Sequence, residues 1–562
     1  MGIPEKTTNN LTELAQLLEM AAELGKHLGN VVSSDEKVSK KTVSMLMNGI
    51  SGLKLEANGA SRGDSSDDEA VTPDESPILA AREVQDLVDG PEPDYYDAFC
   101  QKYIDFTYEN PTTFHVVVAI GELLKQNGYT YLPERADWSV ELKSPGNYYT
   151  TRSGTSLVAF SIGEDWEPQL GASIIGSHID ALAAKLKPIS TKDKVSGYEL
   201  LAVSPYSGGM SNVWWDRDLG LGGRVVVRKS SKETDSGYKT EAVLINSTPH
   251  PIGRIPTLAP HFGAPSQGPF NLETQTVPVI GFDDGEAEEP TEDEKKSHLY
   301  GKHSLKLLRY VAKLAGVSVS ELYYLDLDLF DVQKGIRGGL SNEFLYAPRI
   351  DDRICSFSAI NALLKFTNSL KKDSPSNHLS IVGLYDNEEL GSLSRQGAKG
   401  GTVESVVSKI LTSFHPKTNL STVYANSIII SADVTHLLNP NFSSVYLENH
   451  KPLPNKGLGL GLDSNGHMAT DSTGVSLMEQ IAEINGDTLQ YFQIRNDSRS
   501  GGTIGPSLSS QTGARTIDMG IPQLSMHSIR AACGYKDIGL AVNFFYSFFA
   551  NWRKVYDSFG DL

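Results

Sequence analysis

The chain has few cysteines, and its basic residues are outnumbered by acidic ones. Only Cys100, Cys355 and Cys533 occur in 562 residues, so the sequence indicates neither a disulfide framework nor a thiolate zinc cluster. There are 50 Lys and Arg residues and 69 Asp and Glu residues, which gives a formal net charge of -19. Because nucleic-acid binding requires clustered basic residues that neutralise phosphates, this composition argues against a nucleic-acid partner.

Long apolar runs are also missing. No stretch approaches the roughly 20 apolar residues that a membrane helix needs, and the start MGIPEKTTNN lacks the basic and apolar regions of a secretory signal. We therefore expect no membrane span and no secretory entry. The few, widely spaced cysteines in turn predict folding in a reducing compartment. The hydrophobic content of 39% is typical of a globular protein with two or three domains.

The first part of the chain predicts a helix followed by a linker. In NNLTELAQLLEMAAELGKHLG the apolar residues recur at spacings of three and four, which predicts an amphipathic helix. From Glu56 to Pro77 the chain is rich in Gly, Ser, Asp and Glu, which is typical of a disordered linker. We predict a helical segment at 1–55 and a linker at 56–90. The helix either packs on its own domain or associates with another molecule.

The rest of the chain alternates between strand-like and helix-like patterns. Apolar runs such as GASIIGS, LSIVGLY and ANSIIISA are separated by helical patterns such as VSLMEQIAEING. This alternation predicts an α/β fold, with a sheet covered by helices on both faces. From about Ala183 to Gly339 shorter alternating strands stand among Gly and Pro turns, which predicts an inserted domain at 183–339. The main domain would then consist of 91–182 and 340–562.

Polar residues end several of the predicted strands, which is where ligands bind in open α/β sheets. The residues of metal-ligand type at these positions are His178 and Asp180 in SIIGSHID, Asp351 and Asp352 in FLYAPRIDDR, Glu388 and Glu389 in IVGLYDNEE, Asp433 in SIIISADVTH, and His527 in IPQLSMHSIR. Taken singly, each residue can equally cap a helix or make an ordinary hydrogen bond. Their convergence at one edge of a sheet would favour a metal site.

These residue types suit a pair of zinc ions. Two imidazoles, one carboxylate able to bridge and further carboxylates would bind two Zn²⁺ ions that keep room for water or substrate. Such a pair can acidify a water and polarise a carbonyl, so amide hydrolysis is the expected chemistry. One of Glu388 and Glu389 would bind metal and the other would move protons. Asp180 would hold the tautomer of the His178 ring, although an ordinary hydrogen bond is an equally simple reading.

Several long motifs resemble one known family. The segments IGSHIDALAAKLKP, WWDRDLGLGGRV, RIPTLAPHF, FLYAPRIDDR, LYDNEELGS, SADVTH, NDSRSGGTIGPSLSSQTGARTIDMG and QLSMHSIR resemble, in order and wording, the aspartyl aminopeptidase family of zinc metallopeptidases. The resemblance runs from about Asp94 to the C-terminus. It implies a zinc-exopeptidase-like catalytic domain with a mixed sheet between helices, an inserted assembly domain, and a homododecamer of tetrahedral arrangement. The implied activity is that of a dinuclear zinc aminopeptidase acting on peptides.

The resemblance also assigns roles to single residues. The ligands of two Zn²⁺ ions per subunit would be His178, Asp351, Glu389, Asp433 and His527. Asp351 would bridge the ions, Glu388 would be the general base, and His261 would reach the substrate of a neighbouring subunit. Family members selective for acidic N-terminal residues carry a Lys in the strand after a KG pair, but NKGLGLGLD has Gly461 there. We therefore predict a preference for neutral or apolar N-terminal residues such as Leu.

The N-terminal segment resembles the propeptide of a vacuolar member of the family. That propeptide carries an amphipathic helix, is made in the cytosol, drives assembly into particles delivered by selective autophagy, and is cleaved on arrival. We therefore expect delivery from the cytoplasm to the vacuole, with an autophagy receptor as a partner of the helix. Residence in the cytoplasm is the alternative.

Two other functions remain open from the sequence. One is a dinuclear zinc amidohydrolase that acts on N-acyl amino acids. The other is a self-assembling autophagy cargo or scaffold in which the metal site is only structural.

Overall fold

The computed structural model describes residues 94–283, 289–370 and 376–560. The helix predicted at 1–55 and the linker predicted at 56–90 both lie outside these residues. None of the helices in the described part of the chain is long and apolar enough to cross a membrane. The described residues form an α/β fold, which confirms the predicted fold class.

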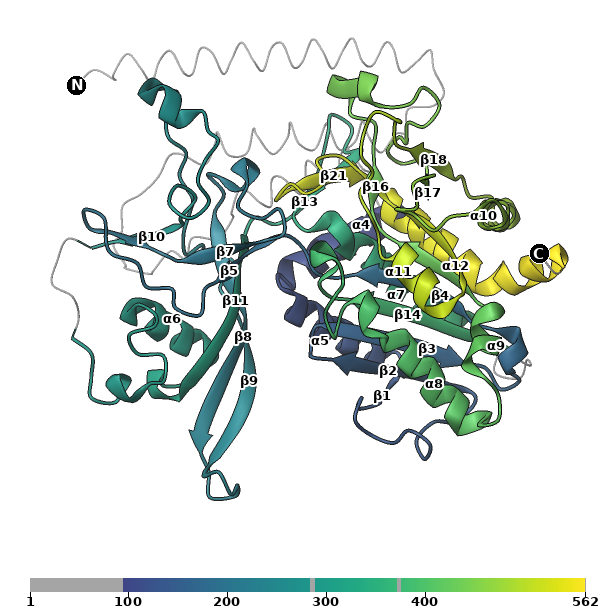
Figure 1. Ribbon diagram of the computed structural model, residues 1–562, viewed down its shortest axis with the longest axis horizontal. Helices are drawn as coiled ribbons and strands as arrows, with labels where there is room; N and C mark the ends of the chain where they lie inside the picture. The colour runs from purple at the N-terminus through teal and green to yellow at the C-terminus, as the bar shows by residue number, and fades with distance from the viewer. Residues whose placement is uncertain (1–93, 284–288, 371–375, 561–562) are drawn as a thin grey trace, which may run out of the picture. The chain divides into compact units, whose positions relative to one another are not determined.

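Nine of the described strands form one mixed sheet, which Figure 1 shows among its helices. In their order across the sheet they are β1 (Thr130–Tyr131), β2 (Gly146–Arg152), β3 (Ser156–Ile162), β14 (Leu379–Tyr385), β4 (Ser173–His178), β15 (Ile428–Ala432), β19 (Arg515–Gly520), β17 (Gly459–Leu462) and β18 (Gln490–Gln493). The central strands β14, β4, β15 and β19 run parallel to one another. Their carboxyl ends therefore meet at one edge, so the side chains that follow them come together.

Helices cover both faces of this sheet. On one face lie α4 (Tyr95–Glu109), α5 (Thr113–Gln126), α7 (Ile350–Ser369), α10 (Ser472–Asn485) and α12 (Asp537–Tyr556); on the other lie α8 (Thr402–Phe414), α9 (Leu420–Ala425) and α11 (Gly505–Thr512). Neighbouring residues of a strand point to opposite faces, so Ile175 packs in the first layer and Ile174 in the second. Both side chains are buried, which explains why the central strands read as continuous apolar runs.

Five further described strands form a second sheet between Ala183 and Asp331. In order they are β7 (Val203–Tyr206), β5 (Ala183–Leu186), β11 (Leu322–Asp331), β8 (Leu219–Ser230) and β9 (Tyr238–Asn246), with each pair antiparallel. The helix α6 (Leu305–Ala315) buries Leu308 and Val311 in the core of this sheet. This hydrophobic cluster is separate from the two that flank the large sheet, so the segment has a core of its own.

Three small sheets complete the described strands. They consist of β6 (Tyr198–Leu200) with β10 (Val279–Phe282), of β12 (Ile336–Gly338), β13 (Phe344–Ala347) and β21 (Ala531–Gly534), and of β16 (Thr435–His436) with β20 (Pro522–Gln523). The chain runs from β13 directly into α7, and from β20 through a loop into β21. Both connections carry residues of the site described next.

Candidate metal centre

The predicted metal ligands come from five different places in the fold. His178 is the last residue of β4, Glu389 lies in the turn after β14, and Asp433 follows β15 directly. Asp351 stands in the first turn of α7, and His527 lies in the loop between β20 and β21. Because the central strands are parallel, the first three arrive at the same edge of the sheet.

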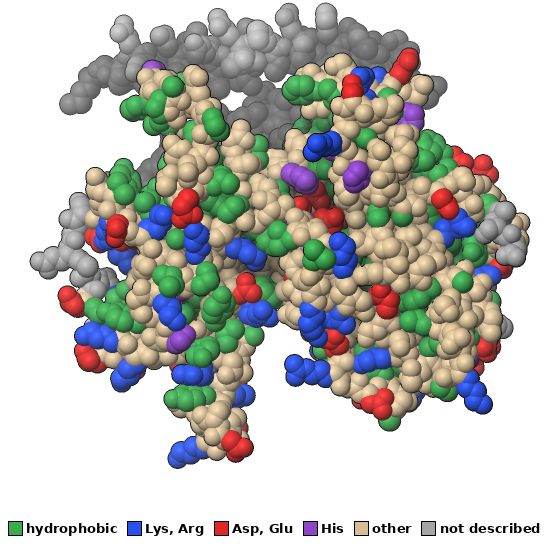
Figure 2. All heavy atoms as spheres, viewed as in Figure 1, with side chains coloured by type: hydrophobic (Ala, Val, Ile, Leu, Met, Phe, Trp, Pro, Cys, Tyr) green, Lys and Arg blue, Asp and Glu red, His purple; other side chains and the backbone are tan. Residues whose placement is uncertain are grey.

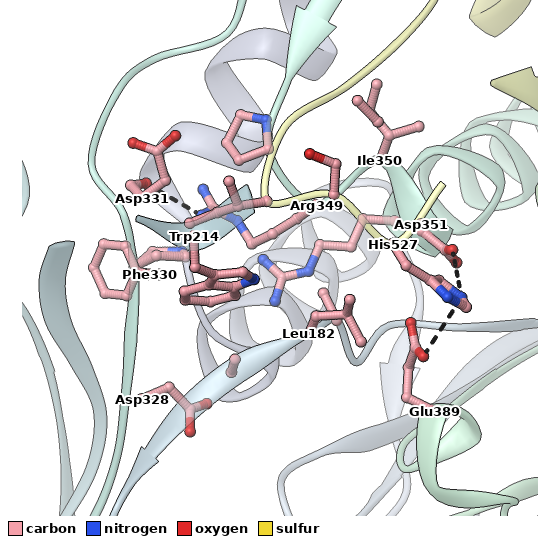
Figure 3. A pocket seen from close by; sticks show the side chains of 18 of the residues that line it. Leu182, Trp214, Asp328, Phe330, Asp331, Arg349, Ile350, Asp351, Glu389 and His527 are labelled. Carbon is pink, nitrogen blue, oxygen red and sulfur yellow. Dashed lines mark hydrogen bonds and ion pairs between the residues drawn. The ribbon is translucent and has the colours of Figure 1, made fainter. Parts of the chain in front are cut away.

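The five side chains form two groups of three that share Asp351. One group is His178, Asp351 and Asp433, and the other is Asp351, Glu389 and His527; within each group the potential ligand atoms lie within 4.8 Å of one another. Asp351 Oδ1 is 3.3 Å from His178 Nε2, and Asp351 Oδ2 is 3.7 Å from His527 Nε2. Figure 3 shows His527 between Asp351 and Glu389, with the imidazole facing both carboxylates.

The chemistry of these residues is suited to binding metal ions. The Glu389 side chain is 5% exposed, and its Oε1 has no hydrogen-bond partner within the described residues. Burial raises the pKa of Glu389 to about 9, and the negative charge of Asp351 adds to the effect. A carboxylate buried in this way is costly unless a positive charge lies beside it. Imidazole and carboxylate ligands without thiolate are a set that zinc accepts.

Glu388 lies beside the two groups but belongs to neither. Its Oε2 is 3.9 Å from His178 Nε2, and its side chain is 16% exposed. Burial raises the pKa of Glu388 to about 8, and the charge of Asp433 contributes. The two adjacent glutamates therefore stand in different surroundings, and Glu388 remains available as a carboxylate next to the cluster.

Asp180 is a buried acceptor at the back of the cluster. Its Oδ1 lies 3.2 Å from His178 Nδ1 and accepts a hydrogen bond from the backbone N–H of Glu388 at 3.1 Å. Its Oδ2 accepts one from the backbone N–H of Glu389 at 3.2 Å. Burial alone would raise the pKa of Asp180, but its hydrogen bond to His178 and the other donors bring it below the ordinary value. Asp180 thus connects the His178 ring to the backbone of both glutamates.

Two contacts from the second sheet were not apparent in the sequence. The hydroxyl of Tyr206, at the end of β7, donates to Asp180 Oδ2 at 2.7 Å. The hydroxyl of Ser207 donates to Glu389 Oε2 at 3.3 Å. The stretch SPYSGG reads as an ordinary turn, so no local pattern marks either residue.

Asp352 and His261 lie apart from the two ligand groups. Asp352 is fully buried, and its Oδ2 accepts a hydrogen bond from Ser177 Oγ at 2.6 Å, so its contact is with the strand and not with the ligands. His261 is exposed in the short 3-10 helix Pro260–Phe262. The role predicted for His261 concerns a neighbouring subunit and stays a prediction.

A pocket opens beside the ligands, as the close view in Figure 3 shows. Leu182, Trp214 and Phe330 line it, together with Asp351, Glu389 and His527. On the face shown in Figure 2, acidic side chains are exposed next to histidines near the middle of the view. The cluster is therefore accessible from a pocket with both apolar and charged walls.

A second, smaller pocket has Asp433 in its lining. Its lining includes Gly459 and Gly461 of β17, Met468, Thr503 and Asp518. At the nearby end of β19 a Cβ on Gly520 would lie 1.7 Å from the carbonyl oxygen of Asp433. Only glycine allows β19 to pass this close to the backbone of the predicted ligand.

Comparisons with known proteins identify the family of the chain. The family described as aminopeptidase I zinc metalloprotease (M18) matches residues 106–549. The chain is 57% identical over 472 residues to vacuolar aminopeptidase 1 of Saccharomyces cerevisiae, which covers 83% of this chain and 91% of that protein.

Solved structures of aminopeptidases also match this chain. The crystal structure of prApe1 matches with a TM-score of 0.80 and 56% identity, over 86% of this chain and 100% of that one. The structure of the S. cerevisiae mApe1 dodecamer matches with a TM-score of 0.75 and 54% identity, over 83% of this chain and 100% of that one. The fold is thus that of a metalloaminopeptidase, a zinc-dependent exopeptidase. The chain belongs to the M18 family of aminopeptidase I zinc metalloproteases, which confirms the resemblance seen in its motifs.

Proposed function

We propose that this enzyme holds two zinc ions and removes neutral or apolar N-terminal residues, such as Leu, from peptides. The observation that carries the proposal is the position of Asp351, which directs one oxygen to each of two ligand groups. A carboxylate in that position can serve two ions at once. The first ion would be held by His178 and Asp433, and the second by Glu389 and His527.

Each residue around the cluster would have a distinct part in the reaction. Bound zinc would supply a Lewis acid that polarises the scissile carbonyl and lowers the pKa of a water. Glu388 would accept a proton from that water as its oxygen attacks the carbonyl carbon, and would return the proton to the amine when the carbon–nitrogen bond breaks. Asp180 would keep the proton of His178 on Nδ1, which leaves Nε2 free to bind metal.

The pocket beside Asp433 supports the preference for apolar residues. No Lys or Arg is among the described residues that line it. A Cβ on Gly461 would lie 2.5 Å from Met468 Sδ, so Met468 fills the space that a side chain at position 461 would need. The lining also includes Asp518, a buried carboxylate that accepts a hydrogen bond from Thr503 Oγ1 at 2.6 Å. Its charge opposes an acidic substrate side chain.

A lysine at position 461 is expected to change the substrate preference. In the double variant Gly461→Lys with Met468→Ala, the ammonium can meet a substrate carboxylate, so the ratio of kcat/KM for Asp over Leu anilides should rise about 10-fold or more. The single variant Met468→Ala is the control and should keep the preference for Leu. Faster cleavage of the Asp anilide by the unaltered enzyme would contradict the proposed preference.

Blocking the substrate amine separates an aminopeptidase from an amidohydrolase. We expect cleavage of a Leu-initiated peptide with a free amine and no cleavage of the same peptide carrying an N-acetyl group, measured by chromatography of the products. Release of acetate or of the acetylated residue would instead favour an enzyme that acts on N-acyl amino acids. Absence of any turnover by the zinc-loaded protein would favour a scaffold with a structural metal site.

The relatives support further proposals on assembly and location. Because mApe1 of S. cerevisiae is a dodecamer, we propose that this chain forms a homododecamer, in a tetrahedral arrangement, through the inserted domain 183–339. His261 would then reach the substrate of a neighbouring subunit. The similarity to a vacuolar aminopeptidase supports delivery from the cytoplasm to the vacuole, with 1–55 as a propeptide that an autophagy receptor binds.

A further inference from the structure

We propose that Tyr206 and Ser207 are positioning residues of the metal centre, through which the second sheet holds Asp180 and Glu389 in place. The inference rests on the metal ligands assigned under the proposed function. Neither residue touches the reacting atoms in this proposal. Tyr206 acts through Asp180, and Ser207 acts through Glu389.

The Tyr206 hydroxyl donates one hydrogen bond and accepts another. The side chain is 6% exposed, and burial raises the pKa of Tyr206, so the hydroxyl keeps its proton. Asp180 can only accept, so Tyr206 donates to it at 2.7 Å and in turn accepts from Asn387 Nδ2 at 2.8 Å. Gln396 Nε2 donates to Asn387 Oδ1 at 3.0 Å, which fixes the orientation of that amide.

This chain of hydrogen bonds reaches the His178 ring and the backbone of both Glu388 and Glu389. Asp180 holds the His178 ring and the backbone N–H groups of Glu388 and Glu389. Asn387 immediately precedes Glu388 and adopts a positive φ of 61°. The Tyr206 hydroxyl therefore contacts Asn387 directly, and through Asp180 it is connected to the backbone of the proposed base Glu388 and the proposed ligand Glu389.

The backbone that carries Tyr206 is fastened to the strand that follows His178 and Asp180. Tyr206 pairs with Ala183 in the antiparallel register of β7 and β5. Just beyond Ser207, a Cβ on Gly209 would lie 2.1 Å from the carbonyl oxygen of Ala183, so the turn packs directly on β5. Lys185 Nζ lies 5.3 Å from the centre of the Tyr206 ring and donates to Asp328 Oδ1 at 2.9 Å. The position of Tyr206 is thus set by the backbone pairing of β7 with β5 and by the contact of its ring with Lys185.

Loss of the Tyr206 hydroxyl should loosen the metal centre without changing the substrate pocket. Asp180 would lose its shortest hydrogen bond, and Asn387 would lose an acceptor. Partners that lie behind metal ligands typically contribute about 10- to 100-fold in metal affinity or activity. Because Tyr206 lies one step behind Asp180, we expect the lower end of this range.

The test compares the full-length variant Tyr206→Phe with the control Tyr148→Phe. Tyr148 is equally buried, at 5% exposed, and its hydroxyl accepts a 2.7 Å hydrogen bond from Lys143 N, but it lies in β2, away from the ligands. We measure release of zinc to a coloured chelator, the visible absorption of the Co²⁺-loaded protein, and kcat and KM on a Leu anilide. Tyr206→Phe should weaken zinc binding and lower kcat about 10-fold, shift the cobalt bands, and leave KM within about 2-fold.

A second variant covers the case in which Tyr206→Phe does not fold. Ser207 is exposed and has a φ of 52°, so Ser207→Gly removes the hydroxyl at a position that glycine tolerates. It should speed zinc release about 3-fold or more by freeing Glu389.

The outcomes separate the inference from the function on which it rests. If the unaltered protein binds zinc and both variants release it as slowly as Tyr148→Phe, with unchanged cobalt bands, the inference is wrong and the proposed function stands. If the unaltered protein binds no zinc, the proposed function fails and the inference fails with it.

Discussion

Replacing Glu388 by Gln is expected to lower kcat on a Leu anilide about 1,000-fold, within the range that a general base contributes. Gln has the same shape but cannot accept a proton from water. Zinc content should stay unchanged, because Glu388 belongs to neither group of potential ligands. The measurement combines kcat with zinc analysis by atomic absorption on the same preparation.

A matched control and two contrary outcomes make this experiment decisive. Glu122→Gln alters an exposed glutamate of α5, whose carboxylate lies 3.8 Å from Lys125 Nζ, and should leave kcat unchanged. Full activity in Glu388→Gln would show that another group takes the proton. Loss of zinc in Glu388→Gln would instead place this residue among the ligands.

Zinc content should depend on which ligand is removed. Asp351→Asn is expected to lose both ions, because an amide cannot offer a charged oxygen to each ligand group. His178→Ala and His527→Ala should each lose mainly one ion, since each histidine belongs to a single group. Activity should fall below detection in all three variants. The measurement is zinc per chain after passage through a metal-free desalting column.

The control for this series is Asp165→Asn, which alters an exposed carboxylate and should keep the full zinc content. If Asp351→Asn retains as much zinc as the control, Asp351 does not bridge. If the unaltered protein holds one ion per chain, the dinuclear site is wrong, although the enzyme class remains. Loss of one ion from Asp351→Asn would mean that its two oxygens serve the same metal.

The strands that carry the ligands could be predicted because each is a buried apolar run. LSIVGLY is the strand β14, Leu379–Tyr385, with all seven residues buried, and the run in ANSIIISA is β15, Ile428–Ala432. Parallel pairing then brings the residues after these runs to one edge, so the meeting of His178, Glu389 and Asp433 was expected. Asp351 and His527 also follow predicted strands, but β13 and β20 belong to small sheets, so the parallel pairing of the central strands does not explain why these two residues join the others.

Other features could not be predicted because they depend on how distant elements pack. Met468 lies in a loop, and only the fold places its sulfur against Gly461. Tyr206 and Ser207 reach the centre from a different sheet, and their contacts join positions 26 and 182 residues apart. Local periodicity carries no information about such contacts.

The sequence by itself determined the fold class, the residue types at the strand ends and the family. Each of these follows from short-range patterns of burial or from motifs that can be read directly. The tertiary structure decided which oxygen of Asp351 faces which histidine. It also decided that Tyr206 and Ser207 donate hydrogen bonds to Asp180 and Glu389. The direction of a side chain relative to residues far along the chain is set by the packing of whole elements, so it becomes visible only when they are assembled.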